Sequence, residues 1–384
     1  MSTFDVAIIG GGLIGVSSAL ELAAHNLRVV VLDRQQPGRE SSWAAAGMLA
    51  PGTDMPEGDV LVPLARESFA LYPEFVAAIE QASGQSSSFE LEGTLEIFVA
   101  PSAETARNKF VAERHRSGLK AEPITAESAR RMEPALGAAA EVAAWVPEEG
   151  IVDPRSLMDA ALAAARNRGV ESRSDCRVES VQLERGRCTG VVAGGNKISA
   201  SHVVVTAGCF SAGIDGGIAQ YAPTKPVRGQ MVSLRHRDTR LTRTLRSENG
   251  YVVPRRDGRI MAGSTLEDAG FEKNVTPAGL LRILAAAVEL VPSLAAAEIL
   301  ETWSGLRPGT PDHLPILGPT DIEGLVIATG HYRNGILLAP VTAKLVREWI
   351  TTGRASLNVE AFSPLRFQRA GAESTHAAHK AAQL

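Results

Sequence analysis

Apolar residues along this chain fall into short runs that alternate with longer stretches of helical periodicity, a pattern typical of α/β proteins. The first run, residues 4–9 (Phe-Asp-Val-Ala-Ile-Ile), is rich in β-branched residues and predicts a buried strand. A glycine-rich turn at 10–15 follows, and an apolar helix continues from it through about His25. A second apolar run, 28–33, then predicts another strand, so the chain opens with a β–α–β unit.

Further stretches have the spacing of helices. They are residues 60–82, 103–117, 154–168 and 276–291, and a last helix that ends near Ile350. Asp153-Pro154 and Thr276 are expected at helix starts, whereas Gly118 is expected to end the second helix in a left-handed conformation. The basic side chains of 103–117 are expected to form a solvated face.

Strand composition recurs between these helices. The expected strands cover residues 93–99, 178–183, 188–192, 198–206, 224–234, 251–264, 298–303 and 324–330, with a hairpin turn at 256–258. The strand at 198–206 ends in a small-residue turn, Ala207-Gly208, and is expected in the same sheet as 4–9. The strand at 324–330 and the helix after it repeat the opening pattern and are expected to return to that sheet. Residues after about Pro364 lack periodicity and are expected to be disordered.

The glycine turn has the spacing G-x-G-x-x-G that dinucleotide-binding folds place between a strand and a helix. Gly10 permits the tight turn, Gly12 lets a pyrophosphate approach the backbone, and Gly15 lets helix and strand pack closely. The helix N-terminus offers N–H groups and a partial positive charge to phosphates. Asp33 ends the second strand, where a carboxylate can accept hydrogen bonds from ribose hydroxyls. We therefore predict a dinucleotide site, the alternative being a glycine turn that only packs tightly.

At 384 residues the chain is long enough for two domains or an interleaved pair. Its hydrophobic content of 45% and charged content of 21% are those of a soluble globular protein. The net charge of −4 (39 basic against 43 acidic side chains) offers no basic field for nucleic acid. The three cysteines lack C-x-x-C spacing, so neither disulfides nor a metal site is expected. The chain shows no basic leader and no apolar span of about 18 residues, so a cytoplasmic location without membrane contact is expected.

Three other segments stand out. Residues 41–51 (Ser-Ser-Trp-Ala-Ala-Ala-Gly-Met-Leu-Ala-Pro) are a series of small residues against which a flat group could lie, although a packed loop is the alternative. Residues 304–310 (Ser-Gly-Leu-Arg-Pro-Gly-Thr) and 330–337 (Gly-His-Tyr-Arg-Asn-Gly-Ile-Leu) each follow a predicted strand. No second G-x-G-x-x-G follows a strand, so no separate NAD(P)H-binding fold is expected. For a redox enzyme with a single bound dinucleotide, the electrons that reduce this cofactor must then come from the substrate itself.

Taken in order, segments 10–15, 41–48, 305–310 and 330–337 resemble the D-amino acid oxidase family of FAD enzymes, most closely its glycine oxidase branch, which serves thiamine biosynthesis. The resemblance extends over about residues 5–352. It implies an α/β fold, with an FAD-binding Rossmann-like domain of the glutathione-reductase type interleaved with an antiparallel-sheet α+β substrate domain. The predicted FAD domain covers 1–85, 146–220 and 308–364, the substrate domain 86–145 and 221–307, and a disordered tail 365–384.

The resemblance also implies which residues hold FAD. The pyrophosphate would meet the backbone of Leu13 and Ile14, the adenosine would meet Asp33 and Arg34, and the adenine would meet Val178. The pyrophosphate and flavin would be reached by Ser41, Ser42, Ala46, Gly47 and Met48. The flavin's pyrimidine edge, where reduced flavin gathers negative charge, would meet a helix N-terminus formed by His331, Tyr332, Arg333, Asn334, Gly335, Ile336 and Leu337. No cysteine lies beyond Cys209, which excludes the C-terminal covalent flavin link of monomeric sarcosine oxidases and leaves FAD non-covalent.

An amino acid substrate needs a fixed cation for its carboxylate, and a guanidinium gives a planar two-pronged grip. Arg307 matches the family's carboxylate-binding arginine, in what we expect to be a rigid turn at a strand end; a surface arginine is the alternative. Tyr251 matches a tyrosine that helps to hold the carboxylate, or simply packs in its strand. Arg333 matches a residue at the active-site entrance, or caps a helix. Met48 and Leu266 are expected to line the pocket, with Leu266 where many glycine oxidases carry a methionine.

The reaction that the resemblance implies oxidises glycine, and with it sarcosine or small D-amino acids, to an imine that water converts to a 2-oxo acid. Molecular oxygen would accept the electrons and give hydrogen peroxide, and a homotetramer is expected. No side chain is assigned as general acid or base, and His331 is expected to act through its backbone. The alternatives are a D-amino acid dehydrogenase of the same fold with another electron acceptor, a non-catalytic flavin-binding module, and the FAD domain of a tRNA-modifying enzyme, which the acidic charge disfavours.

Overall fold

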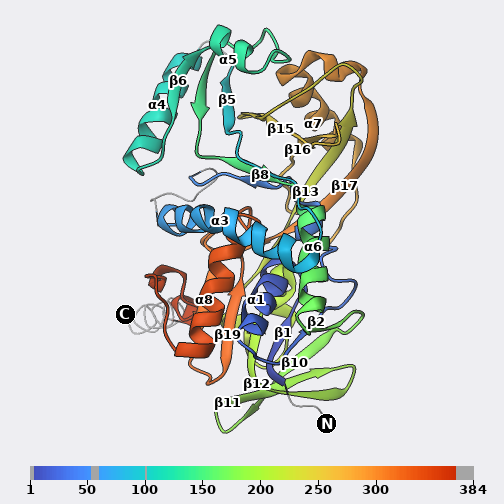
Figure 1. Cartoon of the computed structure of the whole chain (residues 1–384), viewed down its shortest axis with the longest axis vertical. Coiled ribbons are helices and arrows are strands. Elements are labelled where there is room, and N and C mark those ends of the chain that lie inside the picture. Colours follow the sequence, from blue (N-terminus) through green and yellow to red (C-terminus); the bar gives the residue numbers. More distant parts are fainter. Residues whose placement is uncertain (1–3, 53–59, 100–101, 369–384) are drawn as a thin grey trace, which may run out of the picture.

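The computed structural model describes residues 4–52, 60–99 and 102–368, which form two parts joined by long strands (Figure 1). Each part is built on an eight-stranded sheet. A small third sheet, of β3 (Met48–Leu49), β4 (Phe89–Glu90) and β8 (Gly150–Val152), lies near the junction of the two parts (Figure 1). None of the helices in the described ranges has both the length and the apolarity that crossing a bilayer requires.

The first sheet carries the opening β–α–β unit. Its strands are β1 (Phe4–Ile9), β2 (Val29–Leu32), β9 (Glu171–Arg173), β10 (Val178–Glu184), β11 (Arg187–Ala193), β12 (Asn196–Val205), β18 (Ile316–Pro319) and β19 (Leu325–Thr329). As expected, β12 and β19 belong to the same sheet as β1; β12 pairs with β1 in parallel, and β19 pairs with β12 in parallel. The carboxyl ends of these parallel strands therefore meet at one edge, the edge at which open α/β sheets bind their ligands.

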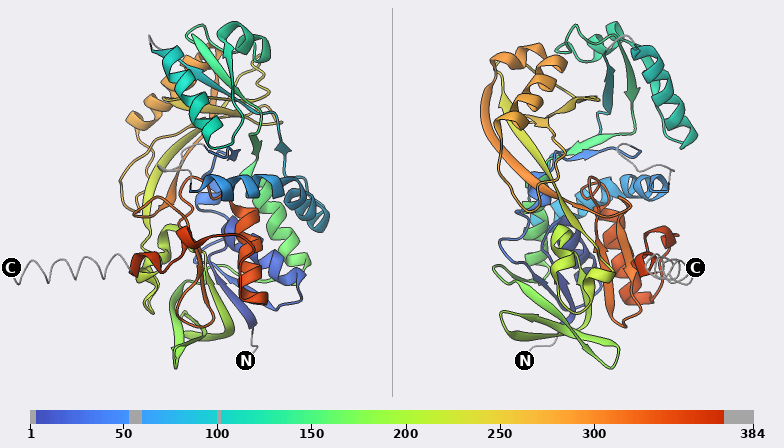
Figure 2. Two further views of the ribbon diagram at one scale, coloured as in Figure 1. Left: turned by 90° about the vertical axis from the view of Figure 1, so that its left-hand side faces the viewer. Right: turned by 180° about the vertical axis from the view of Figure 1, so that it is seen from behind.

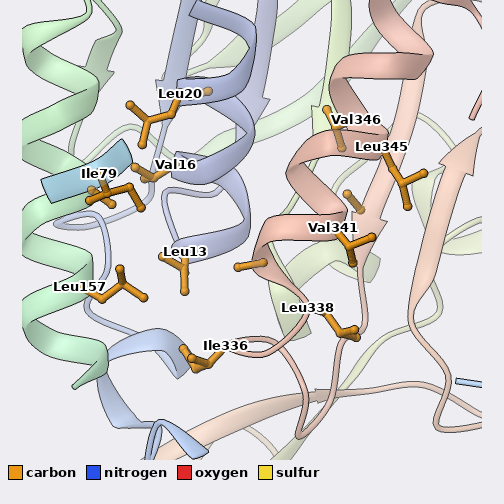
Figure 3. Packing of buried hydrophobic residues seen from close by; sticks show 14 of the residues in the cluster. Leu13, Val16, Leu20, Ile79, Leu157, Ile336, Leu338, Val341, Leu345 and Val346 are labelled. Atoms are coloured by element: carbon orange, nitrogen blue, oxygen red, sulfur yellow. The ribbon is translucent and has the colours of Figure 1, made fainter. Parts of the chain in front are cut away.

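Four helices pack beside this sheet: α1 (Leu13–Ala24), α3 (Val62–Ser83), α6 (Pro154–Asn167) and α8 (Ala339–Thr352). Figure 3 shows α1 between α6 and α8, with Leu13, Val16 and Leu20 pointing into a shared apolar cluster. All three side chains are buried, as is typical of a helix that is apolar on several faces. The expected caps form, since Asp153 Oδ1 accepts a hydrogen bond from the Arg155 N–H at 3.0 Å.

The second sheet has the strand order β17-β13-β16-β15-β14-β5-β7-β6. These strands are β5 (Thr94–Phe98), β6 (Glu122–Thr125), β7 (Val142–Val146), β13 (Lys225–Arg235), β14 (Thr244–Ser247), β15 (Gly250–Pro254), β16 (Ile260–Gly263) and β17 (Glu298–Gly309). The helices α4 (Ala103–Arg116), α5 (Ala126–Met132) and α7 (Pro277–Leu290) belong to this part, away from α1 and α8 (Figure 2). The sheet is not purely antiparallel as expected, because β14 and β5, which come from distant parts of the chain, pair in parallel.

The fold class is confirmed, and the strands of the first sheet all fall within the segments predicted for the FAD domain. Two strands of the second sheet, β7 and β17, each run across a predicted boundary. The division of the chain into domains stays a prediction.

The motif at 304–310 is not the turn that we expected. Strand β17 continues through Gly309, because β13 pairs with it from Lys225 opposite Gly309 to Arg235 opposite Glu298, with one register shift between Ser233 and Leu234. Strand pairing over this length holds the backbone more firmly than a turn would.

One basic side chain of α4 does not face solvent. Arg114 is 3% exposed and lies 3.0 Å from a carboxylate oxygen of the fully buried Glu149, which also pairs with Arg246 at 3.0 Å. Arg246 in turn lies 2.6 Å from Glu96. Buried carboxylates need cationic partners, so the expectation of a solvated face is wrong for Arg114.

The turn after β19 is longer than predicted, since α8 begins only at Ala339. The turn is closed by backbone hydrogen bonds, from the Asn334 N–H to the His331 carbonyl and from the Leu338 N–H to the Asn334 carbonyl, both at 2.8 Å. Pro340 then occupies the first turn of α8, where its missing N–H costs nothing.

The predicted disordered tail begins too early. Residues 365–368 are described, and the Arg366 Nε donates to Asp312 Oδ2 at 2.7 Å, while Leu365 and Phe367 pack against the apolar cluster on the far side of the first sheet. The rest of the predicted tail, 369–384, lies outside the described residues.

Candidate functional site

A cavity of about 880 Å³ opens at the carboxyl ends of β1, β12 and β19 and extends to the second sheet. The glycine turn, the end of β2, the 41–48 segment and the turn after β19 contribute one part of its lining. Strands β13, β15 and β17 contribute the other part. The cavity therefore joins the predicted dinucleotide site to the predicted substrate residues.

The glycine turn is shaped by close backbone contacts. Gly10 has φ +105°, and a Cβ there would lie 2.7 Å from the carbonyl oxygen of Thr206. A Cβ on Gly15 would lie 2.0 Å from the carbonyl oxygen of Gly10, so helix and strand approach as closely as the spacing predicted. At Gly12 a Cβ would meet only Ser42 Oγ, at 3.3 Å, which leaves the backbone open toward the cavity. Ser42 Oγ also accepts a hydrogen bond from the Leu13 N–H at 2.9 Å.

Asp33 holds the end of β2 beside this turn. Its Oδ2 accepts from the Gly11 N–H at 2.7 Å, and its Oδ1 accepts from the Gln35 N–H at 3.0 Å. Burial raises the pKa of this carboxyl, whereas the two backbone hydrogen bonds oppose the rise. Next to it, the Arg34 guanidinium lies 3.9 Å from the centre of the Phe210 ring, and both residues line the cavity.

Arg307 lies near the end of β17, opposite Val227 of β13. Its Nη1 donates to the Thr265 carbonyl at 3.1 Å, and its Nη2 donates to Ser264 Oγ at 2.7 Å. Gly229 makes room for it, because a Cβ at that position would lie 2.3 Å from the guanidinium nitrogens. These two hydrogen bonds therefore fix the orientation of the guanidinium in a residue that lines the cavity.

Tyr251 and Met231 line the same end of the cavity. Both side chains are buried, and the Tyr251 hydroxyl donates to Met231 Sδ at 3.4 Å. Both residues are paired with Gly263 of β16, where a Cβ would lie 2.3 Å from the sulfur and 2.9 Å from the hydroxyl. This glycine makes room for the pair, and Met231 is a site residue that sequence reasoning missed.

His331 and Arg333 come from the turn after β19 and also line the cavity. Arg333 is exposed, whereas His331 is buried and its Nε2 lies 3.0 Å from Thr342 Oγ1. Burial lowers the pKa of His331 to about 3, so its imidazole is neutral at physiological pH. A neutral, enclosed imidazole accords with a role for this residue through its backbone.

The depressed pKa of His331 predicts a pH-dependent stability. The unfolded chain protonates this group near pH 6.5 and the folded chain does not, so folding stability is lost as pH falls below that value. Between pH 7 and 5 we expect wild type to lose about 2 kcal/mol more of its unfolding free energy than His331→Gln. Urea unfolding at both pH values measures this, with the exposed His25→Gln as control. Equal pH dependence of wild type and His331→Gln would contradict a buried neutral histidine.

Most of the predicted site residues meet at this cavity. Those that line it are Gly10, Gly12, Leu13, Ile14, Asp33, Arg34, Ser41, Ser42, Ala46, Gly47, Met48, Val178, Tyr251, Arg307, His331, Tyr332, Arg333, Gly335 and Ile336. Gly15, Asn334 and Leu337 lie behind the lining, in the packing that supports it. Leu266 is 56% exposed and is not among the lining residues, because the chain leaves β16 before it.

Further lining residues had no motif to mark them. Thr206, Ala207 and Gly208 follow β12, as the predicted position of that strand implied, whereas Ser264, Phe271 and Lys273 reach the cavity only through the tertiary fold. Lys273 Nζ lies 2.6 Å from Glu40 Oε2. This salt bridge connects the segment after β16 with the part of the protein that contains the first sheet.

The residues that line the cavity suit a ligand such as FAD in their charge and in the backbone that they leave open. The residues that line the cavity include both the open backbone at Gly12 and Arg307. Its basic side chains are Arg34, Arg177, Lys225, Lys273, Arg307 and Arg333, against the acids Asp33 and Glu40. Such an excess of cations in a chain of net charge −4 suits a pyrophosphate together with a substrate carboxylate.

Comparison with known proteins agrees with this geometry. The profile of the FAD dependent oxidoreductase (DAO) family matches residues 5–349. The "Bifunctional protein ThiO/ThiG" of Trichormus variabilis is 36% identical over 99% of this chain, which spans only 57% of that protein. The "Glycine oxidase" of Pseudomonas putida is 34% identical, covering 94% of this chain and 98% of its own. The crystal structure of glycine oxidase from Geobacillus kaustophilus superposes with a TM-score of 0.90 at 30% identity, covering 94% of this chain and 98% of that one.

Proposed function

Because the chain belongs to the FAD dependent oxidoreductase family, we propose that it is an amino acid oxidase of the glycine oxidase type, with FAD held non-covalently. In the proposed reaction, glycine, oxygen and water give glyoxylate, ammonia and hydrogen peroxide. Sarcosine and small D-amino acids are proposed as further substrates. Since the chain spans little more than half of the bifunctional relatives, this activity is proposed for the present chain and not carried over from them.

The observation that carries this proposal is the setting of Arg307. Its guanidinium is oriented by Ser264 Oγ and the Thr265 carbonyl, and the residue lines the cavity. A guanidinium that is oriented in this way can bind a substrate carboxylate in a bidentate pair. Tyr251 supports the same assignment, because its hydroxyl can turn from the weak acceptor Met231 Sδ to a carboxylate oxygen.

The chain's residues then position the substrate for its oxidation. Bound FAD would supply the chemistry by accepting a hydride from the substrate's Cα. Arg307 and Tyr251 would hold the carboxylate, Met48 would bound the pocket, and Arg333 would stand at the entrance. When the substrate's amine is neutral, the hydride can leave Cα directly, so we assign no general acid or base. The protein would then contribute to the rate by orienting the substrate. The exposed Leu266 receives no role in this proposal.

For FAD itself, we propose that the pyrophosphate lies at Gly12, Leu13 and Ile14, with the adenosine at Asp33, Arg34 and Val178. The small-residue segment 41–48 and the turn at 331–337 would hold the flavin. The open backbone at Gly12 and the carboxylate of Asp33 support this direction along the cavity.

The test of the proposed function is a substrate panel on the purified yellow holoprotein. Glycine, sarcosine and D-alanine are expected to bleach the flavin without oxygen and to release hydrogen peroxide in air. A flavin that glycine reduces but that stays reduced in air would instead indicate a dehydrogenase with another electron acceptor. A flavin that no small amino acid bleaches would indicate a non-catalytic flavin-binding module.

The biological setting is also a proposal. We propose that the imine product serves thiamine thiazole biosynthesis in the cytoplasm, and that the protein is a homotetramer. The match of 95–99% of this chain to bifunctional ThiO/ThiG relatives supports the first of these. Rescue of a thiamine auxotroph that lacks its own glycine oxidase, and the mass measured by light scattering, would test them separately.

A further inference from the structure

Several carbonyl groups of the segment Trp43–Met48 accept hydrogen bonds from residues that do not line the cavity. The Ala44 carbonyl accepts from Trp303 Nε1 at 3.1 Å, the Ala46 carbonyl accepts from Arg255 Nη2 at 2.5 Å, and the Gly47 carbonyl accepts from the Val152 N–H at 2.9 Å. Two of these donors, Trp303 and Arg255, are side chains of the second sheet's part, whereas the segment itself belongs to the flavin side of the cavity.

This arrangement determines where the N–H groups point. In a trans peptide the N–H is directed opposite to the preceding carbonyl, so fixing the Ala46 carbonyl on Arg255 directs the Gly47 N–H the other way, toward the cavity. Among the described residues, the N–H groups of Ala46 and Gly47 have no acceptor. Both residues line the cavity, and a buried N–H without a protein acceptor is normally satisfied by water or a ligand.

The Arg255 side chain is buried and has polar partners besides the Ala46 carbonyl. It follows β15, is 8% exposed, and donates through Nη1 to the Pro254 carbonyl at 3.3 Å. Asp153 lies 3.7 Å from its Nε and also pairs with Arg259 at 3.0 Å. Burial lowers the pKa of Arg255 to about 10, which still leaves the guanidinium charged at neutral pH.

Close contacts restrict the backbone conformation of the segment Trp43–Met48. Gly47 has φ +78°, and a Cβ there would lie 1.9 Å from the Val152 carbonyl oxygen. A Cβ on Gly305 of β17 would lie 2.4 Å from Ala44 Cβ, so the segment is pressed against the second sheet. Within this tight packing, the Arg255 guanidinium is the charged donor that sets the orientation of the 46–47 peptide.

We propose that Arg255, with Asp153 as its counter-ion, is a positioning residue for FAD. It acts through the Ala46 carbonyl and turns the Gly47 N–H toward the flavin, without touching the cofactor itself. Since this contact crosses from the substrate sheet to the flavin side, Arg255 also couples the position of the substrate residues to that of the flavin.

The test compares FAD binding by Arg255→Met, Arg255→Lys and Asp153→Asn with the matched control Arg256→Met, whose side chain is exposed. Titration of each apoprotein with FAD, followed by flavin fluorescence, gives the dissociation constant. Loss of a hydrogen bond to a charged group predicts a constant about 10- to 100-fold higher for Arg255→Met. The increase should be smaller for Arg255→Lys, which keeps the charge, and for Asp153→Asn, which keeps the helix cap, and absent for Arg256→Met.

A residue that only stabilised the fold would give a different result. It would lower the melting temperatures of the apo and FAD-bound forms equally and leave the FAD constant and the visible absorption of the flavin unchanged; that outcome in Arg255→Met overturns the proposal. The proposal expects a larger fall in the FAD-bound form and a shifted flavin absorption. If Arg255→Met does not fold, wild-type FAD constants and spectra in both Arg255→Lys and Asp153→Asn would equally overturn it.

Discussion

Replacing Arg307 by alanine is expected to lower kcat/KM for glycine by roughly 1,000-fold. Removing one partner of a desolvated charge pair costs about 4 kcal/mol, because the substrate carboxylate is left without its cation. Most of the change should fall on KM, since the guanidinium holds the carboxylate before and during the reaction. Steady-state peroxide production over a range of glycine concentrations measures both constants.

The control for Arg307→Ala is Arg235→Ala, which removes an exposed arginine from the far end of β13 and should leave both constants unchanged. The visible spectrum of each variant shows whether FAD is still bound. Unchanged kinetics in an Arg307→Ala protein that retains FAD would remove this residue from the site, although the family assignment would stand.

Replacing Gly15 by alanine is expected to weaken FAD binding by at least about 100-fold, or to yield protein without flavin. The added Cβ would lie 2.0 Å from the Gly10 carbonyl oxygen and 2.7 Å from Thr206 Oγ1. Neither contact can be tolerated, so α1 must move away from β1 and the glycine turn must open. Overpacking of this kind costs about 3 kcal/mol. The flavin-to-protein absorbance ratio after purification, and the FAD dissociation constant, measure the effect.

Ala24→Ser is the control for Gly15→Ala, since it adds one atom at the exposed end of the same helix. It should bind FAD as wild type does. Wild-type FAD affinity in Gly15→Ala would mean that the glycine turn is only tightly packed and does not shape the cofactor site.

The parts of the fold that were predicted correctly are those that depend on local sequence. An apolar run rich in β-branched residues, a glycine turn and an apolar helix leave little choice but β1, the turn and α1. The place of β12 in the same sheet as β1 was expected from the apolar run at its end, Val203 to Val205, and from the small-residue turn that follows. Helix caps such as Asp153 also depend only on near neighbours.

The errors fall where distant segments decide the outcome. The proline and glycines at 305–309 suggest a turn locally, but pairing with residues 225–229 of β13 keeps them in β17. The charge of Arg114 suggests solvent, but Glu149 approaches it from another part of the chain. Leu266 matches a pocket position by its place in the chain, yet its side chain is exposed, because side-chain direction depends on where β16 ends.

By itself, the sequence determined that this chain contains a dinucleotide fold, because glycine spacing and strand-forming runs are local properties, and its motifs resemble those of an FAD-dependent family. Only the tertiary structure decided how the two ends of the cavity are joined. Ser264, Thr265 and Gly229 orient Arg307, and Arg255 holds the Ala46 carbonyl, although these contacts join residues far apart in the chain. Such contacts arise from the packing of the second sheet against the first sheet's part, and no local pattern encodes which polar groups that packing brings within hydrogen-bond distance.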